Sequence, residues 1–204
     1  MEYLATSPAT IALIAANVIA SFMAFNSPAF MEQNLFHVRP ILKNKEYHRL
    51  LTSGFLHGGL FHLFINMYVL LGFGAVIEDG IGTLRFLVIY FAALLGGNLW
   101  ALMENRNKPD YRALGASGAT SGIILSYCLF LPFSMLSFFF IPMPAIVFAI
   151  LFIGVSAWLA QRENKIIGHE AHLGGAIAGL VATIAVAPAA LSSFGEQVAA
   201  FLGG

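Results

Sequence analysis

A serine and a histidine stand out in this chain because each lies at the start of an apolar stretch. Ser117 lies in the segment GASG, residues 115–118, and His172 lies in the segment AHLGG, residues 171–175. An unassisted hydroxyl is a poor nucleophile at neutral pH. An imidazole, with a pKa of about 6.5, is a suitable general base for it and a suitable acid for a leaving amine. Side by side, the two residues are the minimum for nucleophilic acyl transfer.

Glycines at four-residue spacing give a reason to place the serine beside the histidine. They are Gly118 and Gly122 after the serine, and Gly175 and Gly179 after the histidine. Small residues four apart form a helix face that lets a second helix approach closely. If the two faces meet, Ser117 and His172 lie at matching heights on neighbouring helices.

Donors for the negative charge of such a reaction are also present. Ser117 lies near a helix start, where free backbone N–H groups and the helix dipole favour a developing oxyanion. His62 and Asn66 are four residues apart and share a helix face, so both can donate to the same oxyanion. We favour this role; hydrogen bonding between helices is the alternative for both side chains.

Composition indicates what must position these residues. Of the 204 residues, 59% are apolar and 10% are charged, whereas about 25% are charged in a typical soluble domain. A water-soluble fold of this size could not cover its surface with so few charges. The chain is therefore an integral membrane protein. Its zero net charge and the lack of a basic patch argue against nucleic acid as a partner.

Charge-free runs predict the membrane-spanning helices, each of which needs about 20 mainly apolar residues. The longest run holds two spans, separated at Pro132 and at Pro142 and Pro144. The predicted spans are residues 8–26, 57–77, 85–103, 115–131, 143–160 and 170–188. The fold expected is all-α: a polytopic bundle of six transmembrane helices in one membrane-embedded domain, residues 1–204, without a soluble domain or a cleavable signal. A tight turn is expected at 79–82, and residues 189–204 form either a short surface helix or nothing ordered.

Counting the spans places the conspicuous polar residues on one face. Spans two, four and six all begin on the same side of the membrane. Near those three starts lie His57, His62, Asn66, Ser117, His169 and His172. Ionisable or amide groups a few residues inside the lipid boundary are costly unless they pair or line a wet cavity. A functional site is therefore the default hypothesis for this face.

These motifs resemble those of the rhomboid intramembrane serine proteases. The matching segments are residues 57–66 (HGGLFHLFIN), 115–118 and 171–179, with Arg49 in the first loop and Glu78 and Gly82 after span two. The resemblance implies a Ser117–His172 dyad, an oxyanion site from His62, Asn66 and the Ser117 backbone, and His57 as a structural hydrogen-bonding residue. It also implies that the substrates are transmembrane helices, cut near the outer boundary after a small residue. Structural support is expected from Arg49, Glu78, Gly115, Gly118, Gly122, Gly175 and Gly179.

Two positions depart from the family pattern. The family often has an aromatic ring four residues after the nucleophile, where the ring packs against the base. Here that position is Ser121, so another group must orient His172. The family arginine usually follows a tryptophan, and here Arg49 follows His48.

Other functions were weighed against this one. The segment His169-Glu170-Ala171-His172 invites a zinc site, but the metalloprotease motif needs histidines four apart with Glu directly after the first. We therefore expect no metal and no cofactor. A transporter also places polar groups at mid-depth, but the chain shows no inverted repeat and no acidic residue within a span. A non-catalytic rhomboid-like binding protein would share the fold, although such relatives usually lack the serine or the histidine.

Orientation is where charge counting and the resemblance differ. Loops one, three and five hold nine of the ten Lys and Arg residues, and Arg85 alone lies on the other face. The positive-inside rule then places the site inside. The resemblance implies a bacterial inner-membrane protein with its active site toward the periplasm or exterior. We expect the family orientation, because the long first loop, residues 27–56, can fold into the membrane edge instead of behaving as a free loop.

Overall fold

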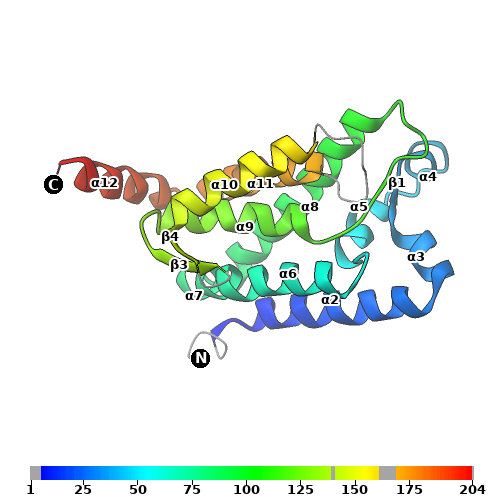
Figure 1. Cartoon of the computed structure of the whole chain (residues 1–204), viewed down its shortest axis with the longest axis horizontal. Helices are drawn as coiled ribbons and strands as arrows, with labels where there is room; N and C mark the ends of the chain where they lie inside the picture. Colours follow the sequence, from blue (N-terminus) through cyan, green and yellow to red (C-terminus); the bar gives the residue numbers. More distant parts are fainter. Residues whose placement is uncertain (1–5, 139–140, 161–168, 204) are drawn as a thin grey trace.

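The computed structural model describes residues 6–138, 141–160 and 169–203. Its long helices form a bundle, with the first loop at one end and a hairpin and the C-terminal helix at the other (Figure 1). The bundle elements are α2 (Pro8–Asn26), α6 (Leu60–Val69), the π-helical turn η2 (Leu70–Gly74), α7 (Ala75–Ile81), α8 (Thr83–Asn105), α9 (Ser117–Phe130), α10 (Ala145–Ala160), α11 (His169–Val186) and α12 (Ala189–Gly203). The all-α membrane bundle expected from the sequence is confirmed.

Among the described residues, three helices are each long and apolar enough to cross a membrane: α2, the continuous helix Leu60–Ile81, and α8. The helices α11 and α12 pass the same test only as a pair bent by 104°. At 14 residues, α9 spans about 21 Å, which is shorter than a hydrocarbon core of about 30 Å. The count of six spans and the extent of a single domain over residues 1–204 therefore stay predictions.

The turn after span two is tighter than the sequence indicated. Residues 79–81 continue the helix α7, and Gly82 alone separates α7 from α8. Gly82 has a φ of +84°, in the left-handed region that favours glycine. The expected turn at 79–82 was therefore wrong in its extent. The Gly82 N–H donates to the Glu78 carbonyl at 2.8 Å, so helical hydrogen bonding continues through Asp79 and Gly80 as far as Gly82.

The first loop folds into a compact cap instead of a free loop. It contains α3 (Pro28–Asn34), β1 (Phe36–His37), α4 (Val38–Lys43), α5 (Arg49–Thr52) and the 3₁₀ turn η1 (Ser53–Phe55). β1 pairs antiparallel with β2 (Arg112–Ala113), with Phe36 opposite Ala113 and His37 opposite Arg112. This pairing ties the first loop to the segment that leads into α9.

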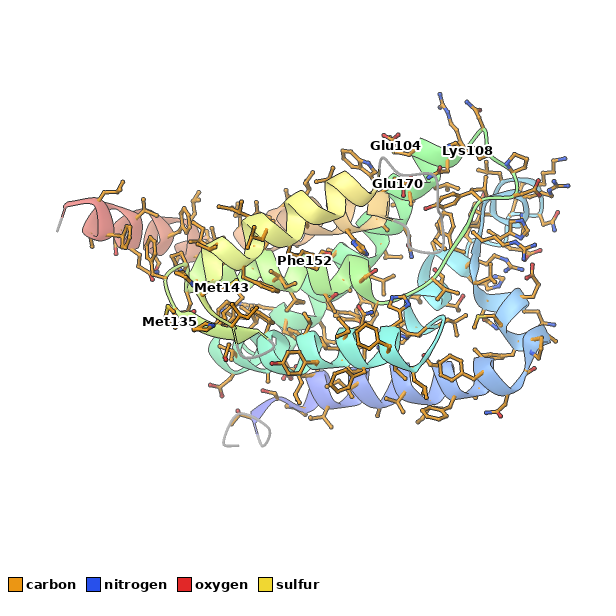
Figure 2. The ribbon with its side chains drawn as sticks, in the orientation of Figure 1. Glu104, Lys108, Met135, Met143, Phe152 and Glu170 are labelled. Atoms are coloured by element: carbon orange, nitrogen blue, oxygen red, sulfur yellow. The ribbon has the colours of Figure 1, made fainter. Side chains whose placement is uncertain are left out.

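At the opposite end, the fourth loop forms a hairpin that the sequence did not predict. β3 (Met135–Phe138) pairs antiparallel with β4 (Ile141–Pro144), from Met135 opposite Pro144 to Phe138 opposite Ile141. Two prolines lie in β4, where they were expected only to break the helix. Figure 2 labels Met135 and Met143 on the two strands of this hairpin.

The helix α11 packs closely against both α8 and α9 through small residues. A Cβ atom added to Gly97 of α8 would lie 2.5 Å from the Ala171 carbonyl oxygen and 3.2 Å from the Gly175 nitrogen. One added to Gly174 would overlap with Trp100 of α8. Neither approach tolerates a side chain without a shift of the helices. The position of α11 is therefore fixed on two sides.

A polar contact between α9 and α11 lies one helical turn beyond Gly122 and Gly179. Ser126 and Thr183 are both fully buried, and their hydroxyl oxygens lie 2.6 Å apart. Ser126 Oγ also lies 2.8 Å from the Gly122 carbonyl oxygen, and Thr183 Oγ1 lies 2.7 Å from the Gly179 carbonyl oxygen. Because each hydroxyl has one proton, one of them donates to its carbonyl and the other donates to its partner hydroxyl. Ser126 lies four residues after Gly122, and Thr183 lies four residues after Gly179. The α9–α11 seam therefore consists of two glycine pairs and one hydroxyl pair on matching turns.

Candidate active site

Ser117 is the first residue of α9, and the two residues before it set its position. Gly115 has a φ of +124°, and its N–H donates to the Ser53 carbonyl at 3.0 Å. A Cβ atom on Gly115 would lie 2.8 Å from Cε1 and 2.9 Å from Nε2 of His62, and 3.7 Å from Ser117 Oγ. Backbone conformation and space both require glycine here. The ring of His62 and the hydroxyl of Ser117 thus both lie near the Cβ position that Gly115 leaves empty.

The predicted contact between the two glycine faces is present in the structure. A Cβ atom on Gly175 would overlap with the Gly118 carbonyl oxygen, and one on Gly118 would lie 3.1 Å from the Ala171 carbonyl oxygen. A Cβ atom on Gly179 would lie 2.9 Å from the Gly122 carbonyl carbon. Ser117 directly precedes Gly118, and His172 directly follows Ala171. The starts of α9 and α11 therefore meet at the residues that flank the proposed pair.

His172 is buried in the first turn of α11, and an aromatic ring stacks on it. The ring belongs to Phe152 of α10, with centroids 6.0 Å apart and planes inclined by 20°. Figure 2 shows Phe152 on α10. Ser121, at the position where the family often has its aromatic residue, instead donates to the Ser117 carbonyl at 2.6 Å. The ring against the histidine thus comes from a different helix from the one the family pattern indicates.

His62 and Asn66 lie on one face of α6, as their spacing predicted. Asn66 is buried, and its amide nitrogen donates to the His62 carbonyl at 2.9 Å. Its amide oxygen accepts from Thr120 Oγ1 of α9 at 3.3 Å. Thr120 lies one turn after Ser117, so this contact ties the face of α6 to the first turns of α9. The amide keeps a second N–H, which is a donor that the His62 carbonyl does not occupy.

His57 joins three segments from behind the proposed site. Its Nε2 lies 3.5 Å from the Ala116 N–H, and its Nδ1 lies 2.9 Å from Ser21 Oγ of α2. With Nε2 accepting, Nδ1 carries the proton and donates to Ser21, whose hydroxyl donates to the Phe55 carbonyl at 3.1 Å. The ring also contacts His62 edge-on, with centroids 5.0 Å apart. These contacts fit the structural role expected for His57.

Arg49 holds the first loop together. Its guanidinium pairs with the Glu46 carboxylate at 2.6 Å and donates to the carbonyls of Glu32 and Leu35 at 2.7 and 2.9 Å. The side chain is buried, and three acceptors surround it. The carbonyls belong to the end of α3, where helix geometry leaves acceptors unpaired. Arg49 therefore ties the loop to a helix end, as the sequence indicated.

Glu78 closes the other end of the bundle. Its carboxylate accepts from the Ala9 N–H at 2.9 Å, the Thr10 N–H at 2.7 Å and the Thr83 hydroxyl at 2.7 Å. The two N–H groups belong to the first turn of α2, which lacks intrahelical partners. A negative charge is favourable at that helix end. One fully buried side chain therefore fixes α2, α7 and α8 relative to one another.

The start of α11 has a further anchor in the third loop. The Tyr111 hydroxyl donates to Glu170 Oε2 at 3.2 Å, and its ring contacts Phe36 edge-on. Burial first, and then the negative charge of Glu170, raise the pKa of Tyr111 well above its usual range. The phenol is therefore neutral and remains a donor to Glu170, two residues before His172. In Figure 2 Glu170 lies at the same end as Glu104 and Lys108.

The comparison with known families agrees with this arrangement. A model of the rhomboid domain matches residues 44–189, a range that contains all the proposed reacting residues. The chain belongs to the rhomboid family. Because the part of the chain that the structure describes contains three helices able to span a membrane, this rhomboid chain is an integral membrane protein.

Individual relatives include proteins with and without a named activity. RHOMBOID-like protein 12, mitochondrial, of Arabidopsis thaliana is 32% identical over 183 residues, 82% of this chain and 54% of that protein. Rhomboid protease GluP of Bacillus subtilis is 30% identical over 158 residues, 78% of this chain and 30% of GluP. Inactive RHOMBOID-like protein 8 of A. thaliana is 41% identical over 88 residues, 43% of this chain and 25% of that protein. This rhomboid chain thus spans about half, or less, of the length of these relatives.

Membership of the rhomboid family leaves two finer expectations open. Because the family includes both a protease and an inactive member, membership alone does not assign catalysis to this chain. Because several relatives are mitochondrial, it does not assign a bacterial inner membrane either.

The rhomboid structure also contains contacts that sequence reasoning missed. Phe152 lies twenty residues before His172 on another helix, and no local pattern connects the two. Gly96 and Gly97 of α8 are adjacent, so they lack the four-residue spacing that marked the other glycine faces. Thr120 lies one turn after Ser117, which is the only signal for its role. The side chain of His169, which was expected near the site, lies outside the described residues.

Proposed function

We propose that this rhomboid is an intramembrane serine endopeptidase that cleaves transmembrane segments of other membrane proteins. The observation that carries the proposal is the glycine seam, because it joins the first turn of α9 to the first turn of α11. Ser117 directly precedes Gly118 and His172 directly follows Ala171, and a Cβ atom on Gly118 would lie 3.1 Å from the Ala171 carbonyl oxygen. A serine held beside a histidine by rigid helices is the arrangement that nucleophilic catalysis requires.

The reaction proceeds by acyl transfer in two halves. Ser117 Oγ attacks the scissile carbonyl carbon while His172 accepts the hydroxyl proton. The tetrahedral intermediate collapses, the C–N bond breaks, and His172 gives that proton to the leaving amine. Water, with His172 again as the base, then hydrolyses the acyl-enzyme and restores the Ser117 hydroxyl. Each half leaves the histidine as it began, so no cofactor is required.

The oxyanion of each intermediate is stabilised from two sides. The backbone N–H groups at the start of α9 point out of the helix, and the helix dipole favours negative charge there. His62 and Ser117 Oγ both lie near the empty Cβ position of Gly115, and Asn66 accepts a hydrogen bond from Thr120 of α9. Donors positioned before the reaction contribute mainly to the transition state, in which the negative charge develops.

Phe152 supplies the orientation of the base in this proposal. A stacked ring limits rotation of the His172 imidazole and excludes water from one of its faces. Because Ser121 carries no ring at this position of α9, the orientation of the His172 imidazole depends on the position of α10. Phe152 is a positioning residue, since it contacts the histidine and not the reacting atoms.

A transmembrane helix is the substrate that fits such a site. The short α9 begins well inside the bundle, so Ser117 lies below the level at which α8 ends (Figure 1). A water-soluble loop would have to enter the bilayer to reach this depth. A membrane-embedded segment near its boundary, with a small residue before the cut, reaches it directly.

We also propose the family orientation, with the active site facing the periplasm or exterior of a bacterial inner membrane. Three arginines lie at the end of the bundle near Ser117, and each pairs with an acidic side chain. The pairs are Arg39 with Asp110, Arg49 with Glu46, and Arg112 with Glu32. The positive-inside rule concerns charges in short free loops. We favour the family orientation over that count because residues 27–56 fold into a cap and do not form a free loop.

A non-catalytic rhomboid-like protein is the alternative, because one relative is named inactive. A metal site is a weaker alternative. Among the residues described, no group of three His, Cys, Asp or Glu side chains is placed to hold a metal ion. Chelators should leave the activity unchanged; loss of activity in a chelator, restored by zinc, would revive the metal reading.

The proposal is tested by cleavage of a transmembrane model substrate in vesicles. The wild-type chain should cut within the membrane segment or at its boundary, and Ser117→Ala should not cut at all. Alanine suits the close helix contact, so this variant should keep the melting temperature of the wild type. If the wild-type chain is folded and cuts no substrate of a panel that differs in boundary residues, the binding-protein alternative is favoured.

A further inference from the structure

The helix α12 is a separate feature, and almost all of it lies beyond the part of the chain that matches the rhomboid domain. It follows α11 after only Ala187 and Pro188, and its axis is inclined by 104° to that helix. If α11 crosses the membrane, a helix at this angle runs roughly parallel to the membrane plane. In Figure 1 α12 extends outward, away from the bundle, from the end that carries the β3–β4 hairpin.

One side of α12 is attached to the bundle. Ala190 is buried, Gln197 donates to the Phe130 carbonyl at the end of α9 at 2.9 Å, and Phe201 stacks on Phe133 with centroids 4.4 Å apart. At about 100° per residue, these three α12 residues share one face of the helix. The contacts fix the rotation of α12 about its own axis.

With that rotation fixed, the two remaining sides of α12 differ sharply in polarity. Leu191 and Leu202 are exposed by 52% and 77%, and their separation of eleven residues places them on one side. Ser192 and Glu196 are both exposed, four residues apart, on a side about 110° away from the leucines. The helix therefore has a protein side, an apolar side and a polar side.

We propose that α12 is an in-plane helix that lies at the lipid–water boundary, with Leu191 and Leu202 in the acyl region and Ser192 and Glu196 in water. Helices with one apolar and one polar face bind at this depth of a bilayer. A helix in bulk water would expose both leucines at a cost, and a spanning helix would bury Glu196 in hydrocarbon at a larger cost.

The neighbourhood of the bend agrees with a position at the headgroup level. A cavity of about 400 Å³ lies beneath the start of α12, and Arg85 of α8 and Ser193 are among its lining residues. Arg85 is exposed in the first turn of α8. A cation at this level can extend toward lipid phosphates. Contact of α12 with lipid does not depend on whether the rhomboid chain is a protease.

The test uses spin labels on the full chain in vesicles of phosphatidylcholine and phosphatidylglycerol. Single cysteines replace Leu191, Leu202, Ser192 or Glu196, all exposed, so the labels disturb no packing. Labels at 191 and 202 should collide several-fold more with oxygen than with a water-soluble nickel chelate, and labels at 192 and 196 should show the reverse. The unsubstituted chain, whose Cys128 is buried, gives the background, and Cys128→Ala provides a second background.

Two results would overturn the inference. If all four labels are accessible to nickel, α12 extends into water. If all four respond mainly to oxygen, α12 lies within the hydrocarbon core. Cleavage activity, measured on the same preparations, separates this outcome from a failure of the proposed protease function.

Discussion

Replacement of Gly179 by valine tests the helix seam on which the site depends. Gly179 lies seven residues after His172, about two helical turns from any proposed chemistry. A Cβ atom there would lie 2.9 Å from the Gly122 carbonyl carbon and 3.1 Å from its oxygen, whereas ordinary contacts begin at 3.4 Å. The same Cβ atom would overlap with the Gly122 Cα, so the two helices must separate by more than the roughly 0.5 Å that the carbonyl carbon alone requires, and by more again for the branched valine.

The expected magnitudes follow from that separation. Overpacking of a close contact costs about 1–3 kcal/mol of stability, and a displacement of about 1 Å between reacting groups can cost about a hundredfold in rate. Gly179→Val should therefore lower the melting temperature in detergent and reduce cleavage at least a hundredfold, with Gly179→Ala in between. Gly72→Ala is the matched control, because a Cβ atom at Gly72 would meet nothing within 4 Å.

The two measurements belong on one preparation of each variant. If Gly179→Val kept both the wild-type melting temperature and the wild-type cleavage rate, the seam would not position Ser117 beside His172. Loss of stability with full activity in the surviving folded fraction would also contradict the reasoning, because displacement of α11 must move His172.

Three further predictions concern single side chains. His62→Ala and Asn66→Ala should each lower kcat with little change in KM, and the loss should correspond to at most about 3–4 kcal/mol of transition-state stabilisation. A loss confined to KM would contradict oxyanion stabilisation. Phe152→Leu should lower kcat and alter its pH profile through His172, whereas Phe152→Tyr should restore both. A leucine variant with wild-type kcat and pH profile would show that Phe152 does not position His172. Glu78→Gln should lower stability by about 1–3 kcal/mol, because an amide cannot accept all three hydrogen bonds, and thermal unfolding that matches the wild type would show that this contact is not needed.

Much of the architecture could be predicted from the sequence because membrane helices follow a simple composition rule. The expected first span, residues 8–26, coincides with α2, Pro8–Asn26. The glycine spacing on either side of the seam was also enough to predict which helix faces meet. Both rules are local: a charge-free run and a four-residue repeat can be read directly from the chain.

The missed features depend on distant contacts or on competing local signals. Phe152 reaches His172 only because α10 packs beside α11, and no spacing rule connects them. Pro142 and Pro144 end a helix, but they do not indicate that the segment pairs with residues 135–138 as a hairpin. Gly80 resembled part of a turn, yet the helix continues through it to Ile81, and the Gly82 N–H still donates to the Glu78 carbonyl at 2.8 Å.

Covalent labelling with a fluorophosphonate probe, mapped by mass spectrometry, tests the central claim most directly. This reagent reacts with a serine activated by a neighbouring base, so it reports the nucleophile without a known substrate. If Ser117 is the nucleophile and His172 its base, we expect one adduct, on Ser117, that is absent in Ser117→Ala and strongly reduced in His172→Ala. A folded wild-type chain that takes no label, or one that is labelled at another serine and stays labelled in Ser117→Ala, would contradict it.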